Sequence, residues 1–265
     1  MKTLIVIPAR YKSTRYPGKP LAMLKGATGV EKSLIERTWL AAQQSKLADE
    51  IVVATDDERI AEAVHAIGGA VVMTSESCRN GTERCAEVAA ARPEFDLYVN
   101  FQGDAPLTPA WFIDDMISAM ADRRDVDVAT PVLNCSGAMR DDLLADRRAG
   151  RVGGTTAVIG AAGRALYFSK EVIPFSNQTY APADRTPVFH HVGAYAYRAP
   201  ALQTYLSLPE GPAERHEGLE QLRFLENGIA VLCVECDARG RAFWELNNPE
   251  DVPKIEAMLT EMGEI

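Results

Sequence analysis

Short apolar runs rich in β-branched residues recur through the first half of the chain, and a segment with helical spacing follows most of them. Five of these runs predict buried strands, at residues 4–7, 50–54, 70–74, 97–101 and 127–131. The intervening segments predict helices, at residues 33–46, 57–68, 82–91 and 108–121. Strand, turn and helix repeat about every 20 to 30 residues, which is typical of βαβ units on a parallel sheet. The pattern therefore constrains the chain to an α/β fold.

The rhythm changes after residue 134. A charged stretch at residues 140–151 fits either a short helix or a loop. Extended runs follow at residues 155–159, 165–168 and 188–197, with a polar loop at 177–187. We expect these runs to pair antiparallel on the edge of the main sheet, as an insertion at about residues 150–200 within one domain of residues 1–265.

After the insertion the chain returns to the earlier pattern. Residues 217–227 predict a helix that Gly228 ends, and residues 229–234 predict a strand. A terminal helix is expected to open at residues 248–251, with Pro249 in its first turn. These elements add a last strand and helix to the same α/β domain.

The first predicted strand leads directly into a loop that is dense in positive charge. Four cations occupy ten positions, although 28 Lys and Arg among 265 residues predict about one there. They are Arg10, Lys12, Arg15 and Lys19. Such a loop beyond the carboxyl end of a buried strand is where an open α/β sheet binds an anionic ligand. The alternative is a solvated basic loop, but Pro17, Gly18 and Pro20 impose a rigid course that solvation alone does not require.

Two further strand-end loops contain candidate ligand-binding residues. Asp104 follows the fourth predicted strand, and a carboxylate facing a cationic loop suits a magnesium ion that bridges phosphates. The alternative is that Asp104 caps the turn before Pro106. Asn80 and Gly81 follow the third strand, where backbone N–H groups either approach a ligand closely or form an ordinary strand-to-helix turn.

Composition and missing motifs argue against several functional classes. The net charge of -9 and the pI near 5.1 argue against nucleic acid as a partner. No apolar run approaches the roughly 20 residues of a membrane span, and no signal-peptide pattern opens the sequence, so we expect a cytoplasmic protein with no membrane partner. GxGxxG, HExxH, GxSxG and Walker motifs are absent from the sequence, which argues against a dinucleotide oxidoreductase.

The cysteines and histidines do not predict a metal centre. Five cysteines in a cytosolic chain are expected as reduced thiols, and Cys233 and Cys236 lie in a strand-like run that favours core packing. His190 and His191 are adjacent in a predicted strand, so they face opposite sides and cannot chelate one ion together. The remaining features fit phosphoryl or nucleotidyl transfer, which needs charge neutralisation and in-line positioning more than a dedicated acid or base.

The motifs resemble those of a known family. VIPARYKSTRYPGKPL at residues 6–21 is similar to the amino-terminal signature of the sugar-activating nucleotidyltransferases. Within them it most resembles the CMP-Kdo synthetase (3-deoxy-manno-octulosonate cytidylyltransferase) family. The likeness continues, in order, through IVVATDDERIAEAV, GGAVVMTSESCRNGTERCAEV, NFQGDAPL, ALYFSKEVIP, HHVGAYAYR and EGLEQLRFLENG. Order and spacing therefore agree over nearly the whole chain.

The resemblance implies both a fold and a reaction. The fold is Rossmann-like, with a mostly parallel central sheet flanked by helices and a small β-rich dimerisation subdomain inserted in it, and the family is typically a homodimer. The reaction transfers CMP from CTP to the anomeric hydroxyl of Kdo or a close acidic sugar analogue. Pyrophosphate leaves, and Mg²⁺ assists.

The resemblance also assigns roles to residues by their position in the matched motifs. Those expected in catalysis are Arg10, Arg15, Lys19 and Asp104, of which the three cations also hold the triphosphate. Those expected around the nucleotide are Ala9, Thr74, Asn80, Gly81, Arg84 and Gln102. Those expected on the sugar side are His191, Tyr195, Glu220 and Gln221. The expected metal ligands are Asp104 and Asn247.

Some positions depart from the family pattern. The family usually reads QGDEP and RHIG, where this chain has Ala105 and His190, and it often has a lysine near residues 152–156. Its GVDTPED motif has a metal-binding aspartate where this chain has Asn247, whose amide oxygen brings no charge. The departures leave three alternatives: another acidic acceptor (an amino-substituted Kdo, a sialic-acid-like sugar or a phosphonate), another nucleotide, or a catalytically weakened paralogue.

Overall fold

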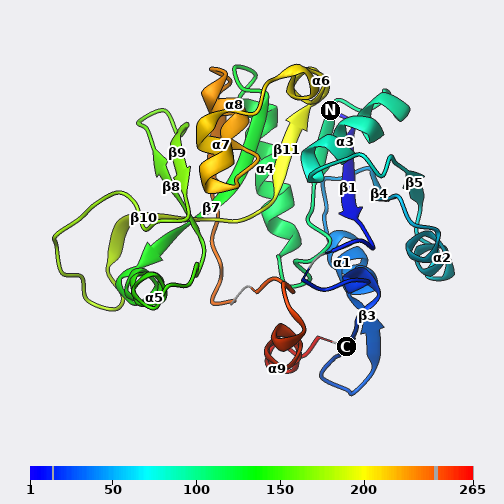
Figure 1. The fold of residues 1–265 in the computed structure, drawn as a ribbon, viewed down its shortest axis with the longest axis horizontal. Helices are drawn as coiled ribbons and strands as arrows, with labels where there is room; N and C mark the ends of the chain where they lie inside the picture. The colour runs from blue at the N-terminus through cyan, green and yellow to red at the C-terminus, as the bar shows by residue number, and fades with distance from the viewer. Residues whose placement is uncertain (14, 242–243, 265) are drawn as a thin grey trace.

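The computed structural model describes residues 1–13, 15–241 and 244–264. Its centre is one mixed sheet of ten strands within these residues (Figure 1). In spatial order nine of them are β5 (Val71–Met73), β4 (Glu50–Thr55), β1 (Thr3–Ala9), β6 (Leu97–Asn100), β11 (Tyr195–Arg198), β7 (Val128–Ser136), β10 (Arg185–His191), β8 (Thr155–Ile159) and β9 (Ala165–Ser169). The tenth, β12 (Val231–Glu235), pairs parallel with β7. A separate hairpin joins β2 (Met23–Lys25) and β3 (Glu31–Ser33).

The sheet is parallel from β5 to β6 and antiparallel from β6 to β9. Four of the five strands predicted from the repeating pattern form the parallel half, whereas the fifth, β7, pairs antiparallel with β11 and β10 and parallel with β12. The antiparallel end contains β10, β8 and β9 of the predicted insertion, but β11 lies within the sheet, between β6 and β7, and not at its edge. The predicted α/β class is confirmed. Because β1, β4 and β6 are parallel neighbours, their carboxyl ends meet at one edge, and the loops that follow them lie close together.

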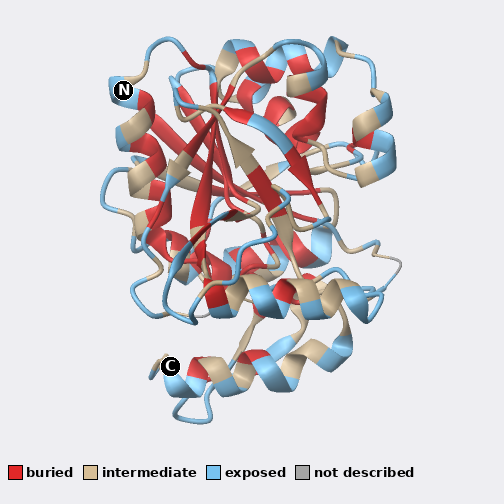
Figure 2. Ribbon diagram, turned by 90° about the vertical axis from the view of Figure 1, so that its left-hand side faces the viewer, coloured by how far each residue is buried: buried red, intermediate tan, exposed pale blue. Residues whose placement is uncertain are grey.

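Helices cover both faces of the sheet, and buried residues concentrate in the strands between them (Figure 2). One face packs against α1 (Leu34–Ala42), α2 (Glu58–Ala66) and α4 (Ala110–Asp122). The other packs against α3 (Gly81–Ala91), α6 (Ala199–Ser207) and α8 (Leu222–Glu226). The remaining helices are α5 (Gly137–Arg148), α7 (Pro212–Glu217) and α9 (Val252–Glu261). No helix in the described part of the chain combines the length and apolar character needed to span a membrane.

Local sequence signals explain several helix boundaries. The Ser33 hydroxyl accepts a hydrogen bond from the Glu36 N–H at 3.2 Å, so Ser33 is the N-cap of α1, as predicted. Asp57 caps α2 in the same way, by accepting from the Arg59 N–H at 3.0 Å. The ambiguous charged stretch is helical, because Ser136 caps α5 by accepting from the Met139 N–H. Side chains that satisfy the first free N–H groups therefore set where these helices begin.

Two elements that were predicted as continuous are interrupted in the structure. Residues 188–197 form parts of two strands, because β10 ends at His191 and β11 begins at Tyr195 in a different place in the sheet. The Thr130 hydroxyl donates to the carbonyl of Ala194 at 2.7 Å, which stabilises the bend between them. The predicted polar loop at 177–187 is correspondingly shorter, because β10 already begins at Arg185.

The predicted helix at 217–227 is also interrupted. Gly218 has a φ of +62°, which ends α7, and α8 begins only at Leu222. Gly228, with a φ of +75°, does end α8, as predicted. The interruption places Glu220 and Gln221 between two short helices, where their side chains reach the interior.

The carboxyl-terminal segment returns to the strand-end edge of the sheet. The backbone N–H of Leu246 donates to the carbonyl of Asp104 at 2.9 Å. A short 3₁₀ turn, Pro249–Asp251, then opens α9 with Asn248 and Asp251 in a capping box, so the predicted terminal helix is confirmed. Residues distant in sequence from the cationic loop therefore lie beside it.

Candidate functional site

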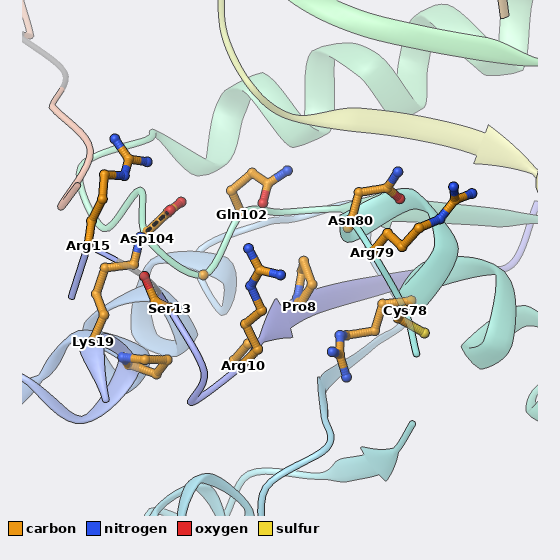
Figure 3. Close-up of a pocket in the computed structure, with 15 residues that line it drawn as sticks. Pro8, Arg10, Ser13, Arg15, Lys19, Cys78, Arg79, Asn80, Gln102 and Asp104 are labelled. Atoms are coloured by element: carbon orange, nitrogen blue, oxygen red, sulfur yellow. Dashed lines mark hydrogen bonds and ion pairs between the residues drawn. The ribbon is translucent and has the colours of Figure 1, made fainter. Parts of the chain in front are cut away.

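A cavity of about 240 Å³ lies where the carboxyl ends of β1 and β6 meet the start of α3 (Figure 3). It is lined by the predicted residues Ala9, Arg10, Arg15, Lys19, Asn80, Gly81, Arg84, Gln102 and Asp104. Three strand-end loops that were predicted separately therefore surround one cavity. It is also lined by Pro8, Ser13, Pro20, Cys78, Arg79 and Gly103, which the sequence did not single out as site residues.

Three of the four loop cations face this cavity. Arg10 has no hydrogen bond or ion pair within the described residues, so its charge is available to a ligand. The Lys19 ammonium is paired with Asp104 at 2.6 Å, and Arg15 donates to the Asn247 amide oxygen at 3.0 Å. Lys12 points elsewhere and pairs with Glu76. The arrangement concentrates positive charge on one wall of the cavity.

The amino terminus of α3 forms the opposite wall. Asn80 caps this helix, because its side-chain oxygen accepts from the Glu83 N–H at 2.8 Å. Gly81 follows, and a Cβ there would lie 2.8 Å from the amide nitrogen of Asn100, which is fully buried. Only glycine fits without movement, and its bare backbone lets a ligand approach the positive end of the helix.

Arg84 belongs to the same wall, and its guanidinium group contacts Thr74 and Asp56. Its guanidinium is almost fully buried, donates to the Thr74 hydroxyl and lies 3.5 Å from Asp56. Thr74 does not line the cavity, so the structure connects it to the site through Arg84. Arg79 is mostly exposed and pairs with Glu83.

Acidic and amide oxygens lie at the Asp104 side of the cavity. Glu245 and Asn247, in the returning carboxyl-terminal segment, lie close to Asp104, and the Asn247 side-chain N–H₂ donates to the Glu245 carboxylate at 3.4 Å. Desolvation of the carboxylate and the negative charge of Asp104 raise the pKa of Glu245. The described residues contain no group of three His, Cys, Asp or Glu side chains placed to hold a metal. Two carboxylates beside a cationic wall nevertheless fit Mg²⁺, which takes few protein ligands and completes its shell with water and ligand oxygens.

None of the four residues predicted on the sugar side lines this cavity. The His191 ring is buried between Phe168 and Tyr195, and its Nε2 lies 2.9 Å from the Thr130 hydroxyl. Burial lowers the pKa of His191 to about 3, so this imidazole is neutral. His191 therefore connects the insertion to the core.

The remaining predicted sugar-side residues are close to the start of α3. The Tyr195 hydroxyl donates to the Gln221 side-chain oxygen at 3.1 Å. The Thr82 N–H, in the first turn of α3, donates to the Glu220 carboxylate at 3.2 Å, and burial raises the pKa of Glu220 to about 7. The side-chain nitrogen of Gln221 is buried without a protein partner in the described part of the chain. The same holds for both amide atoms of Asn100.

Ser13, Arg79 and Glu245 were not named as site residues from the sequence, for two different reasons. Ser13 and Arg79 lie within the predicted loops, so loop membership was the available signal. Glu245 is two positions from Asn247, but only the fold brings it beside Asp104. Chemically, the site combines cations for a polyphosphate, a helix amino terminus and hard oxygen ligands, which is a set suited to nucleotidyl transfer.

Comparisons with known proteins agree with this geometry. A family model described as Cytidylyltransferase matches residues 4–231. The chain is 43% identical, over the full length of both proteins, to the 3-deoxy-manno-octulosonate cytidylyltransferase of Maricaulis maris. It is 37% identical to the mitochondrial enzyme of that name from Arabidopsis thaliana, over 97% of this chain and 82% of the relative.

Solved structures give the same grouping. A CMP:2-keto-3-deoxy-manno-octonic acid synthetase complexed with CTP superposes with a TM-score of 0.84 at 35% identity, over 99% of this chain and 100% of the other. A 4-diphosphocytidyl-2C-methyl-D-erythritol synthase from Anaerococcus prevotii has a TM-score of 0.58 at 15% identity, covering 97% of this chain and 96% of the other, which reflects the shared fold alone.

Proposed function

This chain belongs to the cytidylyltransferase family, and we propose that it transfers CMP from CTP to the anomeric hydroxyl of 3-deoxy-manno-octulosonate (Kdo), with release of pyrophosphate. The full-length relatives bear the name of that activity, and the solved relative was complexed with CTP. The observation that supports the proposal most strongly is the convergence of Arg10, Arg15 and Lys19 with Asp104 around one cavity. A triphosphate and a divalent cation are the ligands that such a set of charges suits.

The proposed reaction is an in-line displacement at the α-phosphorus of CTP. The acceptor hydroxyl forms the new P–O bond and loses its proton, while the bond to the β-phosphate oxygen breaks and pyrophosphate leaves. Arg10, Arg15 and Lys19 neutralise the phosphates, and the backbone at Gly81 places the start of α3 against the nucleotide. Mg²⁺, with Asp104 among its ligands, supplies further charge neutralisation when bound.

The acceptor is proposed to bind toward His191, Tyr195, Glu220 and Gln221. Buried amide groups without protein partners are costly, so Asn100 and Gln221 favour a neighbouring ligand with several hydroxyl groups. Kdo has this character. His190, at the family's arginine position, lines a separate cavity with Asn134 and Arg185.

A pyrophosphate-release assay tests the function. We expect release with CTP, Kdo and Mg²⁺, and much less with UTP, GTP or ATP. Replacing Kdo by an amino-substituted Kdo, a sialic acid or a phosphonate compares the alternative acceptors directly. No release from CTP with any of these acceptors would contradict the proposed activity, and a clear preference for another acceptor would correct the substrate.

We propose in addition that the protein is a homodimer formed through residues 150–200. Exposed apolar side chains in this stretch support the proposal, since Phe175 is 91% and Leu166 64% exposed. Both are unfavourable in water unless another surface covers them.

A further inference from the structure

We propose that Glu245 supplies the second protein carboxylate to the divalent cation at this site, and that Asn247 positions Glu245 instead of binding the cation itself. The inference rests on the proposed nucleotidyl transfer and deepens it, because it identifies which residue replaces the charge that Asn247 lacks. It concerns the returning segment, residues 244–248, and its contact with the end of β6.

The Asn247 side chain is already engaged at both ends. Its amide oxygen, the atom that would bind a cation, accepts from the Arg15 guanidinium at 3.0 Å. Its amide nitrogen donates to the Glu245 carboxylate at 3.4 Å. The backbone beneath it is held as well, because the N–H groups of Asn247 and Asn248 donate to one carboxylate oxygen of Asp251, at 3.0 and 2.7 Å. Asn247 therefore links the cationic loop to Glu245.

The Glu245 carboxylate is placed beside Asp104 by three contacts. The neighbouring Leu246 N–H donates to the Asp104 carbonyl at 2.9 Å, which fixes the segment against the end of β6. The carboxylate also lies near Gly193 and Gln102, since the Cβ position of Gly193 is 3.5 Å from a Glu245 oxygen and 3.9 Å from Gln102. The third contact is the one with Asn247. Glu245 thus shares the neighbourhood of two residues that line the cavity, Gln102 and Asp104.

The charges around this point are incompletely balanced. Lys19 pairs with Asp104, whereas Glu245 has no ion pair with Lys, Arg or His within the described residues. Two neighbouring carboxylates repel each other unless a cation lies between them. When a triphosphate binds Lys19 and Arg15, Asp104 loses its ion pair with Lys19 and Asn247 loses its hydrogen bond with Arg15. The carboxylates of Asp104 and Glu245 then repel each other more strongly unless a cation binds between them. Two carboxylates with phosphate oxygens and water are an ordinary ligand set for Mg²⁺.

The position of Glu245 also explains the departure at Asn247. Residues two apart on an extended chain point to the same side, and the hydrogen bond between Glu245 and Asn247 shows that these two do so. A carboxylate at position 245 can therefore serve the cation that an aspartate at position 247 would serve. The site then keeps two negative charges, and the chain need not be a weakened paralogue.

Binding of Mn²⁺, measured by electron paramagnetic resonance, tests this inference without relying on turnover. The protein is saturated with α,β-methylene-CTP, and free Mn²⁺ is titrated. We expect Glu245→Gln to weaken Mn²⁺ binding roughly tenfold or more. Adding Asn247→Asp to that variant should restore most of the affinity, because the charge returns to the same side of the segment. Glu250→Gln, an exposed carboxylate in the same segment, is the matched control and should bind Mn²⁺ like the original protein.

The outcomes separate the two proposals. Unchanged Mn²⁺ affinity in Glu245→Gln, with circular dichroism showing a folded protein, would overturn the role of Glu245. So would the absence of Mn²⁺ binding by the unaltered protein in complex with the analogue. If the unaltered protein still releases pyrophosphate from CTP and Kdo, only the inference fails. If it does not, the proposed function itself fails.

Discussion

At the scale of single residues, close packing and local charge decide what each position can do. Gly81 has no room for a side chain beside the buried Asn100, and Arg84 is buried against Thr74 and Asp56. Lys12 shows the opposite case, because it belongs to the same cationic loop as Lys19 but pairs with Glu76 outside the cavity. Charge density in a sequence therefore identifies a loop, and the fold selects which of its residues face the ligand.

The first prediction at this scale concerns Gly81. In Gly81→Ala, the new Cβ would lie 2.8 Å from the Asn100 amide nitrogen, so the buried amide or the helix start must move. We expect a loss of about 1–3 kcal/mol in the free energy of unfolding in urea and a raised KM for CTP. Gly160→Ala is the control, since its Cβ would come closest to the exposed Leu166 side chain at 3.3 Å and would meet the Arg164 carbonyl oxygen at an ordinary contact distance of 3.5 Å. Equal behaviour of the two variants would refute the close packing at Gly81.

The second prediction concerns the pH dependence of stability. The pKa of Glu220 is about 7 in the folded protein, above its usual 4.5, because burial disfavours the charged carboxylate. The contribution of Glu220 to the free energy of unfolding is fully present below pH 4.5. It is lost as the pH rises to about 7, which lowers the free energy of unfolding by at most about 3 kcal/mol. Glu220→Gln should therefore gain stability relative to the unaltered protein between pH 5 and 8.

Urea unfolding of both proteins across this pH range measures the difference. His190 and His191, with pKa values lowered by burial to about 4 and 3, destabilise the fold as the pH falls below their ordinary pKa of 6.5. That contribution is common to both proteins and cancels in the difference. A difference that does not change with pH would show that Glu220 ionises normally in the folded state.

At the scale of elements, the capped starts of two helices, α3 and α9, position the side chains of the site. The amino terminus of α3 faces the cavity because Asn80 caps it there, and the 3₁₀ turn before α9 holds Glu245 and Asn247 against β6. Both segments depend on side chains that satisfy free backbone N–H groups. The geometry of the site is therefore coupled to the capping of short elements.

The prediction at this scale concerns Asp251. Its carboxylate accepts from the Trp244 indole at 2.9 Å and from the N–H groups of Asn247 and Asn248. Asp251→Ala removes all three bonds, so we expect a loss of about 1–2 kcal/mol in stability and a reduced kcat/KM, because Glu245 is no longer held beside Asp104. The control is Glu250→Ala at the exposed neighbouring position. Unaltered kcat/KM in Asp251→Ala would show that the turn does not position the site.

At the scale of the whole molecule, the sheet has two halves with different roles. The parallel half places three strand-end loops around the cavity, and the antiparallel half projects β8, β9 and β10 away from it (Figure 1). The second half contains the exposed apolar side chains Phe175 and Leu166. This division separates the proposed nucleotide site from the proposed assembly surface.

The prediction at this scale is an oligomeric state. We expect the protein to be a dimer by size-exclusion chromatography with light scattering, and Phe175→Asp to shift it toward monomer, since a charge is costly in an apolar interface. Leu206→Asp, at an exposed apolar position on α6 outside the insertion, should leave the dimer intact. A monomeric unaltered protein at micromolar concentration would contradict the proposal.

Much of this architecture could be predicted because its signals are local. The β-branched run of β1, the Ser33 cap of α1 and the cation density after β1 are all properties of a few neighbouring residues. The prediction failed where neighbours in sequence separate in space. Residues 188–197 look like one strand, but the chain bends at Val192–Ala194 and enters the sheet again between β6 and β7.

The sequence by itself determined the fold class, the three strand-end loops and the cations among them, because periodicity and charge density act over short distances along the chain. Only the tertiary structure decided which of these groups meet. It left Lys12, His191 and Gln221 out of the lining of the cavity, and it brought Glu245 beside Asp104 from the other end of the chain. Contacts between distant segments depend on how the sheet is ordered and how its ends are covered, and no short stretch of sequence contains that information.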